Sequence, residues 1–287
     1  MASLSAIFAG ITSILVKLGV KNTDSDIATA IRTIVVLIFA IIMTFIVNSF
    51  ESIKTISTKE WIFLILSGLM TGLSWICYFR ALSLGDVNKV APIDKSSATI
   101  TALLAIIIFS ETNMLWLKLL SIFGILVGTI LMIEKKDIDI KENKKSWFVY
   151  AILSAIFASL TSIFAKIGLT NVESNLGTAI RTVVVLIMAW IIVFARKKTP
   201  EIKLINKKEL VFILLSGLTT GASWLCYYSA VKTGILSVVV PIDKLSVLIT
   251  VVFSTLVLKE KLKLKAAIGL ILIVVFTIVM ALFCWHA

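Results

Sequence analysis

Charged side chains recur at equivalent places within long apolar stretches of this sequence. They are Lys17, Arg32, Asp94 and Lys95 in the first half of the chain and Lys166, Arg181, Asp243 and Lys244 in the second. A charge inside an apolar segment is costly unless it is paired or hydrated, so such residues tend to mark solute or ion pathways. We expect each aspartate to pair with basic residues of its own half, and the set to act in gating or ion coupling. The alternative is that the basic residues reach lipid headgroups and serve as anchors.

Aromatic residues form a second repeated group. The segment 67–78 returns as 216–227, and each copy carries two glycines four residues apart, followed by a tryptophan and a tyrosine. Because membrane tryptophans usually lie at the bilayer interfaces, a repeated pair at mid-span predicts the wall of a solute-binding cavity. The predicted binding residues are Trp75, Tyr78, Trp224 and Tyr227. The alternative is that these rings fill the core between helices, where the glycines permit close helix packing.

Few residues are available for catalysis or metal binding. The single histidine is His286, at the end of the sequence, and the three cysteines are too few for a disulfide framework. No glycine-rich nucleotide loop occurs in the sequence. We therefore expect no enzyme activity, no metal site and no cofactor.

The composition places the repeated residues in a membrane. Of the 287 residues, 59% are hydrophobic and 15% are charged, and the mean hydropathy is +1.07. Soluble proteins are about 45–50% apolar. The net charge of +12 is better explained by membrane topology and lipid contact than by nucleic acid. We expect membrane lipids and a small-molecule solute as partners, no nucleic acid, and a location in the cell membrane.

The sequence is a tandem duplication. An offset of 149 positions aligns Ser5 with Ser154 and Pro92 with Pro241, without a gap from Ala2 to Glu111. Roughly half of about 110 aligned positions are identical. We expect a first repeat over 1–133, a charged linker over 134–146 and a second repeat over 147–287, with one chain acting as a monomer.

Apolar runs predict an all-α protein with five membrane spans in each half. The expected spans are 3–20, 27–47, 61–84, 90–109 and 115–133, then 147–169, 176–194, 210–232, 235–258 and 266–283. The first is expected to be a helix and not a cleaved signal peptide, because its copy is internal. Pro92 and Pro241 are expected in the first turn of the fourth helix of each half, where proline costs little.

An odd number of spans per half places the two halves in opposite orientations in the membrane. Inverted repeats are the architecture of secondary transporters, so we expect alternating-access transport of a small polar or amphipathic metabolite. The alternative function is a passive channel or facilitator. Lysine and arginine are most frequent in the connections after spans 1, 3, 5, 7 and 9, which predicts both termini outside the cell.

These features together resemble the EamA family of the drug/metabolite transporter superfamily. The resemblance lies in the five spans per half, in Arg32 within 29–33, and in the segment 84–97 that contains Pro92 and Asp94. The chain is similar to two small five-helix EamA units fused into one. The resemblance implies ten helices that move small metabolites, and it implies both termini in the cytoplasm, which leaves the orientation open.

Overall fold

The computed structural model describes residues 1–84, 90, 93–132, 146–257, 259 and 262–285. Across this part of the chain the regular structure is entirely helical, with no strand, so the predicted all-α class is confirmed. Residues 134–145 of the predicted linker, Pro92 and His286 lie outside the described residues.

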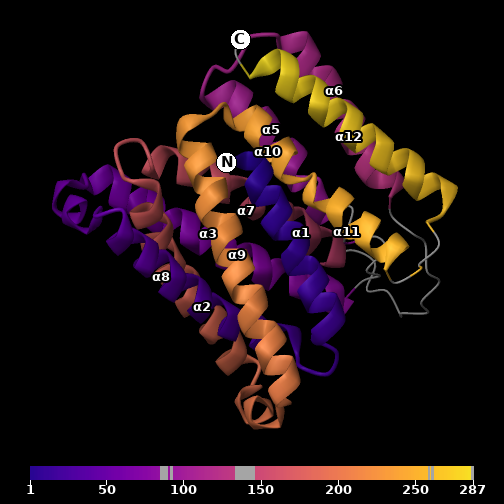
Figure 1. Cartoon of the computed structure of the whole chain (residues 1–287). Helices are drawn as coiled ribbons and strands as arrows, with labels where there is room; N and C mark the ends of the chain where they lie inside the picture. The colour runs from indigo at the N-terminus through magenta and orange to yellow at the C-terminus, as the bar shows by residue number, and fades with distance from the viewer. Residues whose placement is uncertain (85–89, 91–92, 133–145, 258, 260–261, 286–287) are drawn as a thin grey trace. The chain divides into compact units, whose positions relative to one another are not determined.

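The helices follow the predicted spans closely (Figure 1). In the first half they are α1 (Ala2–Gly19), α2 (Ser25–Ile46), the 3-10 helix η1 (Phe50–Thr55), α3 (Thr58–Leu84), α5 (Ser97–Ile108) and α6 (Leu115–Leu131). In the second half they are α7 (Ser146–Gly168), α8 (Ser174–Ala195), the 3-10 helix η2 (Thr199–Leu204), α9 (Lys207–Thr233), α10 (Leu236–Asp243), α11 (Ser246–Leu256) and α12 (Leu264–Cys284). Among the described residues, eight helical segments are long and apolar enough to cross a bilayer, and α6 is a shorter apolar helix. The protein is therefore a multi-pass membrane protein.

The fourth helix of each half is interrupted at the same place. In the second half, α10 ends at Asp243 and α11 begins at Ser246, and the amides of Lys244 and Leu245 bond to carbonyls three residues earlier. In the first half, Ile93 to Lys95 are helical and a turn at Ser96 precedes α5. Ser96 and Leu245 are equivalent residues.

The predicted place of Pro241 is wrong. Helix α10 begins at Leu236, so Pro241 lies inside the helix and not in its first turn. Proline has no N–H, which leaves the Ser237 carbonyl without its usual donor four residues later. The start at Leu236, which agrees with the expected span 235–258, has a physical cause. The Glu111 carboxylate accepts the Leu236 and Ser237 amides, each at 2.8 Å, and so satisfies two donors that would otherwise be unpaired.

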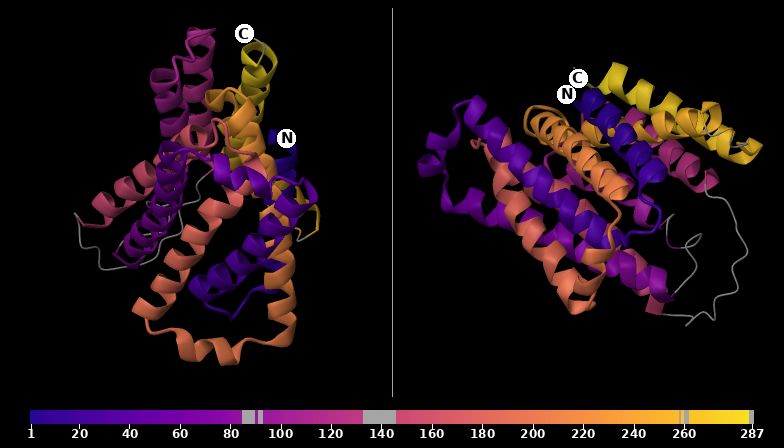
Figure 2. Two further views of the ribbon diagram at one scale, coloured as in Figure 1. Left: turned by 90° about the vertical axis from the view of Figure 1, so that its left-hand side faces the viewer. Right: turned by 60° about the horizontal axis from the view of Figure 1, so that its bottom comes forward.

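The chain forms two compact units, and each unit combines segments of both halves. The first unit is Met1–Gly72 with Phe164–Thr233, and the second is Leu73–Ile163 with Gly234–Ala287. In the first unit, α1 packs along α9 and α2 packs along α8, as the views of Figure 2 also show.

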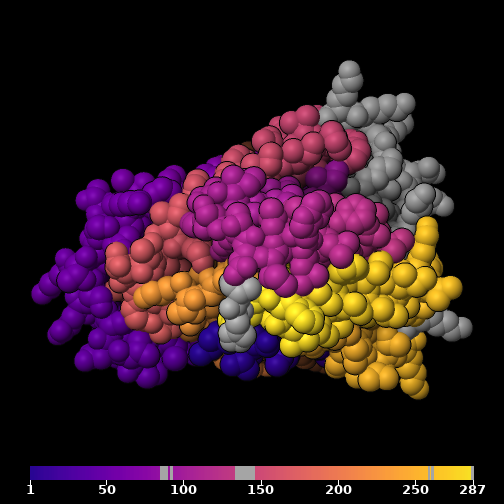
Figure 3. Space-filling view, turned by 90° about the horizontal axis from the view of Figure 1, so that it is seen from above, coloured from indigo at the N-terminus to yellow at the C-terminus, as the bar shows by residue number. Residues whose placement is uncertain are grey.

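Glycines allow close helix packing within each unit. A Cβ on Gly68 would lie 2.8 Å from the Arg181 carbonyl of α8, and one on Gly217 would lie 3.2 Å from the Arg32 carbonyl of α2. The predicted packing role of these glycines is therefore confirmed. In the second unit, α6 packs along α12, where a Cβ on Gly128 would lie 2.6 Å from the Gly269 carbonyl. The pair is visible as neighbouring magenta and yellow atoms in Figure 3.

Candidate functional site

Arg181 is the largest fully buried side chain of the first unit and has an unusual set of neighbours. Its Nε donates to the Ser67 hydroxyl at 3.1 Å and its Nη2 donates to the Thr71 hydroxyl at 3.0 Å. The guanidinium carbon lies 4.1 Å from the centre of the Tyr228 ring and 5.4 Å from that of Trp224. Cation–π contacts of this kind are worth about 2 kcal/mol when the cation is desolvated. The sequence-predicted residues Arg181 and Trp224 therefore lie together.

One nitrogen of the Arg181 guanidinium makes no hydrogen bond to the described residues. The Nη1 atom of Arg181 is buried and has no hydrogen-bond acceptor among the described residues. The neighbours that interact with its charge are Tyr227 and Tyr228, and no carboxylate of the described residues is among them. The site therefore presents a desolvated positive charge with an unfilled donor.

The equivalent arginine of the first half has a different environment. Arg32 is only half-buried, and its Nη2 donates to the Thr29 hydroxyl at 3.1 Å. The two halves also differ in sequence here, because Tyr228 is matched by Phe79. Two positions that are identical in sequence thus differ in burial and hydrogen bonding.

The second unit contains both copies of the repeated Asp-Lys pair, Asp94-Lys95 and Asp243-Lys244, at the helix interruptions. Asp94 Oδ1 accepts the Ser154 hydroxyl at 2.9 Å, and Ser154 also exchanges hydrogen bonds with Ser74 across α3 and α7. Lys95 lies close enough to Lys244 and to Asp94 to interact with both charges.

The predicted ionic partners of Asp94 divide between the two units. Lys95 belongs to the second unit with Asp94, whereas Lys17 and Arg32 belong to the first. In the same way, Asp243 belongs to the second unit, whereas Lys166 and Arg181 belong to the first. The gating role of these charges stays a prediction.

The cavity-lining role of the aromatic residues also stays a prediction. Trp75 and Tyr78 lie on the part of α3 in the second unit, and Trp224 and Tyr227 lie on α9 in the first. All four side chains are half-buried.

Matching contacts join the halves at the helix ends of the first unit. Glu209, in the first turn of α9, accepts the Asn22 and Thr23 amides at 3.2 and 2.9 Å. Its equivalent Glu60, in the first turn of α3, accepts the Asn171 amide at 3.0 Å, and Asn171 is the equivalent of Asn22. The same contact is thus made twice, with the halves exchanged.

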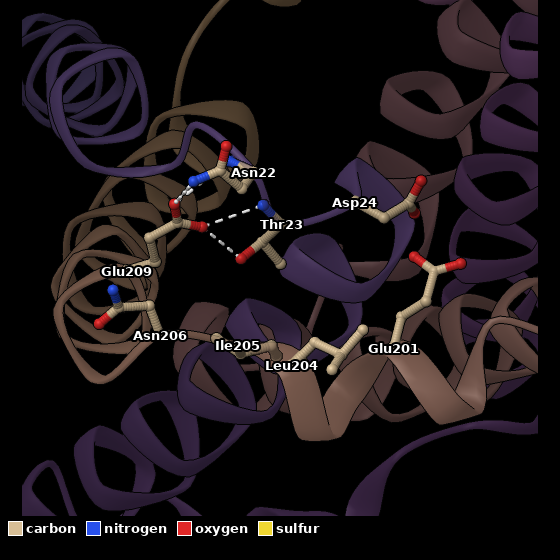
Figure 4. Close-up of a pocket in the computed structure, with 8 residues that line it drawn as sticks. All are labelled: Asn22, Thr23, Asp24, Glu201, Leu204, Ile205, Asn206 and Glu209. Carbon is tan, nitrogen blue, oxygen red and sulfur yellow. Dashed lines mark hydrogen bonds between the residues drawn. The ribbon is translucent and has the colours of Figure 1, made fainter.

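An ion-pair network lies beside the first of these contacts. Lys198 bonds to Asp24 at 2.5 Å and to Asp26 at 2.8 Å, and Arg196 also bonds to Asp26 at 2.8 Å. A pocket of about 480 Å³ opens here, and Figure 4 shows its lining, in which Glu209 is already bonded to Asn22 and Thr23. Because these polar groups bond to one another, we interpret this region as a contact that stabilises the packing of the segments and not as a solute-binding site.

Sequence reasoning missed several residues of these sites. The hydroxyls of Ser67 and Thr71 belong to the repeated segment 67–78, so their repetition was a usable signal. Tyr228 could have been found only as a difference between the repeats. Ser154 and Glu111 gave no local signal, because their partners lie 60 and 125 residues away in sequence.

Comparison with known proteins identifies the class and then the family. A multi-pass helical membrane protein with buried, repeated charges has the features of a solute carrier. The model of the EamA-like transporter family matches residues 1–134 and again residues 145–282. The chain therefore belongs to the EamA-like transporter family and is a membrane transporter. The resemblance to two fused EamA units is confirmed, because the family matches twice.

Individual relatives agree with this assignment. A protein of Sinorhizobium sp named "Uncharacterized transporter in cobO 3'region" is 42% identical over 139 residues, which cover 48% of this chain and 99% of that protein. An uncharacterized protein of Methanocaldococcus jannaschii is 29% identical over 134 residues, which cover 47% of this chain and 95% of its own. A solved structure titled "Crystal structure of protein" shares the fold, with a TM-score of 0.71 at 14% identity over 98% of this chain and 96% of that one.

Proposed function

We propose that this protein is a secondary transporter that moves a small polar or amphipathic metabolite by alternating access between two inverted five-helix repeats. The observation that carries the proposal is the pair of exchanged contacts in the first unit. Glu60 binds the amide of Asn171, and Glu209 binds the amide of Asn22.

These contacts support a two-fold relation between the repeats. The rotation that superposes Glu60 on Glu209 also superposes Asn171 on Asn22. Applied twice, this rotation returns each residue to its starting place, as a two-fold axis requires. The glycine contacts of Gly68 with α8 and of Gly217 with α2 follow the same exchange. With five spans in each half, such an axis lies in the membrane plane, and the halves can exchange conformations to open the protein to one side and then to the other.

The residues predicted from the sequence have roles within this proposal. Trp75, Tyr78, Trp224 and Tyr227 contribute aromatic faces that contact the solute. Asp94 and Asp243, together with the repeated lysines and arginines, contribute to gating. Transport is driven by the solute gradient or by protons, and for protons these two aspartates are the candidate carriers.

Counterflow in proteoliposomes tests this proposal. A thermal-shift screen against amino acids, sugar phosphates and quaternary amines first selects a solute, because a ligand of the native state raises its melting temperature. Vesicles loaded with the unlabelled solute should then accumulate the labelled solute transiently, with a saturable rate. Flux that rises linearly with concentration and shows no counterflow would instead identify a passive channel or facilitator.

A further inference from the structure

We infer that Arg181 forms a binding subsite for an oxyanion, a carboxylate or a phosphate, carried by the transported solute. The inference rests on the proposed transport function and names the chemical class of the solute. It depends on the surroundings of one guanidinium group within the first unit.

The first step is the missing counter-charge. Arg181 is fully buried, and arginine remains charged in proteins. Neutral hydroxyls and aromatic rings surround it, and no carboxylate of the described residues pairs with it. A buried cation without a counter-ion is costly, and an arriving anion would offset that cost. Its attraction would be strong because the surroundings are poorly polarisable.

The second step is the direction of approach. The guanidinium carbon lies over the Tyr228 and Trp224 rings, so these rings form part of its surroundings. Along its edges, Nε is occupied by Ser67 and Nη2 by Thr71. The Nη1 donor is the one that lacks an acceptor in the described part of the chain. A carboxylate or phosphate oxygen accepts N–H donors of this kind, and the guanidinium fork suits both anions.

The third step is the comparison within the chain. Arg32 occupies the equivalent position of the first half, but it is half-buried and its surroundings differ. Phe79 stands where the second half has Tyr228, so the first repeat lacks the matching phenol hydroxyl. The subsite is therefore assigned to the second repeat, and Arg32 provides a matched control.

Ligand-induced stabilisation of the purified full-length protein tests the subsite. Melting temperatures are measured in detergent without added lipid, with acetate, benzoate or inorganic phosphate and with the neutral analogues acetamide and benzamide. We expect at least one anion at saturating concentration to raise the melting temperature by about 3 °C, and its neutral analogue to have no effect. If none of the three anions stabilises the wild-type protein, that result alone would overturn the inferred anion subsite.

Two matched substitutions locate the effect. Arg181→Lys keeps the positive charge but loses the planar fork, so it should weaken anion binding about tenfold or more. Arg32→Lys, at the equivalent arginine of the first repeat, should weaken anion binding less than Arg181→Lys does. Equal losses in both variants, or a loss only in Arg32→Lys, would contradict the assignment to Arg181. Lysine keeps the positive charge at position 181. The experiment therefore needs no variant in which the buried cation is removed and folding is put at risk.

Further results distinguish a solute anion from a lipid phosphate. They also distinguish failure of the Arg181 subsite from failure of the transporter proposal. Stabilisation by short-chain phosphatidylglycerol, but by none of the soluble anions, would assign Arg181 to a lipid phosphate and overturn the solute subsite. Counterflow of a neutral solute that is unchanged in Arg181→Lys would reject the subsite while the transporter proposal stands. Stabilisation by anions without counterflow of any solute would reject the transporter proposal, while the anion subsite at Arg181 would stand.

Discussion

The two repeated arginines show that identical local sequence does not guarantee identical burial. Arg32 and Arg181 lie in nearly identical segments, and the sequence predicts both as charged residues within spans. It does not predict that one is fully buried and the other half-buried, because burial depends on the helices packed against each arginine. The Tyr228 and Phe79 difference is the one local hint. Repeated residues are thus predictable as a set, and their individual roles are not.

The ion-pair network gives a prediction about pH. Burial opposes ionisation of Asp24, but hydrogen bonds from Lys198 and the Asp26 amide outweigh it and lower the pKa of Asp24 below its ordinary 3.8. Burial also opposes the charge on Lys198, but its hydrogen bonds to Asp24 and Asp26 raise its pKa above its ordinary 10.5. The stabilisation by Asp24 is present above pH 3.8 and is lost as pH falls through its lowered pKa. The stabilisation by Lys198 is present below pH 10.5 and is lost as pH rises through its raised pKa.

Lys198→Ser tests this network, because serine is the equivalent residue, Ser49, of the first half. The variant should be about 1–2 kcal/mol less stable at neutral pH, since buried Asp26 loses one of its two cations. Its stability should also change less than that of wild type at the acidic and alkaline extremes. Thermal unfolding in detergent across the pH range measures both effects, and an unchanged profile would show that the network contributes nothing.

Among the helices, hydropathy predicts the limits of the spans well but does not predict the interruption within the fourth helix of each half. The ends of α1, α2, α3 and α12 lie close to the expected limits because each span is a long apolar run. The start of α10 at Leu236 agrees with the expected span 235–258, but hydropathy does not predict the break after Asp243 or the depth of Pro241 in the helix. Its first amides are satisfied by Glu111, which is distant in sequence, so Pro241 lies deeper in the helix than its local preference suggests.

Glu111 should therefore be required for the start of α10. Glu111→Ala removes two charge-assisted hydrogen bonds and should lower the free energy of unfolding by about 2–4 kcal/mol. Glu111→Gln keeps one acceptor oxygen and should have an intermediate effect. Denaturant unfolding of the three proteins checks the order. If alanine and glutamine are both as stable as wild type, the carboxylate does not hold this helix start.

At the scale of the whole molecule, the duplication and the all-α class are predicted by the sequence, but the two compact units are not. Two of their boundaries fall inside α3 and α7 and the third falls at the end of α9, and each unit combines helical segments from both halves. That division follows from packing between distant segments, which no local pattern contains. The family assignment and the exchanged contacts give the transporter proposal support that hydropathy alone lacks.

Under the proposed inversion of the halves, Asp94 and Asp243 occupy equivalent positions in the sequence, and their neutralisation should have opposite effects on gating. Asp94→Asn should favour opening toward the face that carries the 85–89 connection, and Asp243→Asn should favour opening toward the other face. A bias of about 1.4 kcal/mol changes the ratio of the two states tenfold. A cysteine in place of Trp224, labelled from each side of the membrane, reports that ratio. Shifts in the same direction, or no shift with transport retained, would reject a gating role for both acids.

The sidedness of two equivalent surface residues tests the inverted architecture most directly. Lys54 in η1 and Lys203 in η2 are equivalent and exposed. Each is replaced by cysteine after Cys77, Cys226 and Cys284 have been changed to alanine, and intact cells are treated with a membrane-impermeant maleimide. We predict that one of the two cysteines is labelled in intact cells and the other only after permeabilisation. Labelling of both from the same side would contradict the inversion and, with it, the proposed alternating-access mechanism.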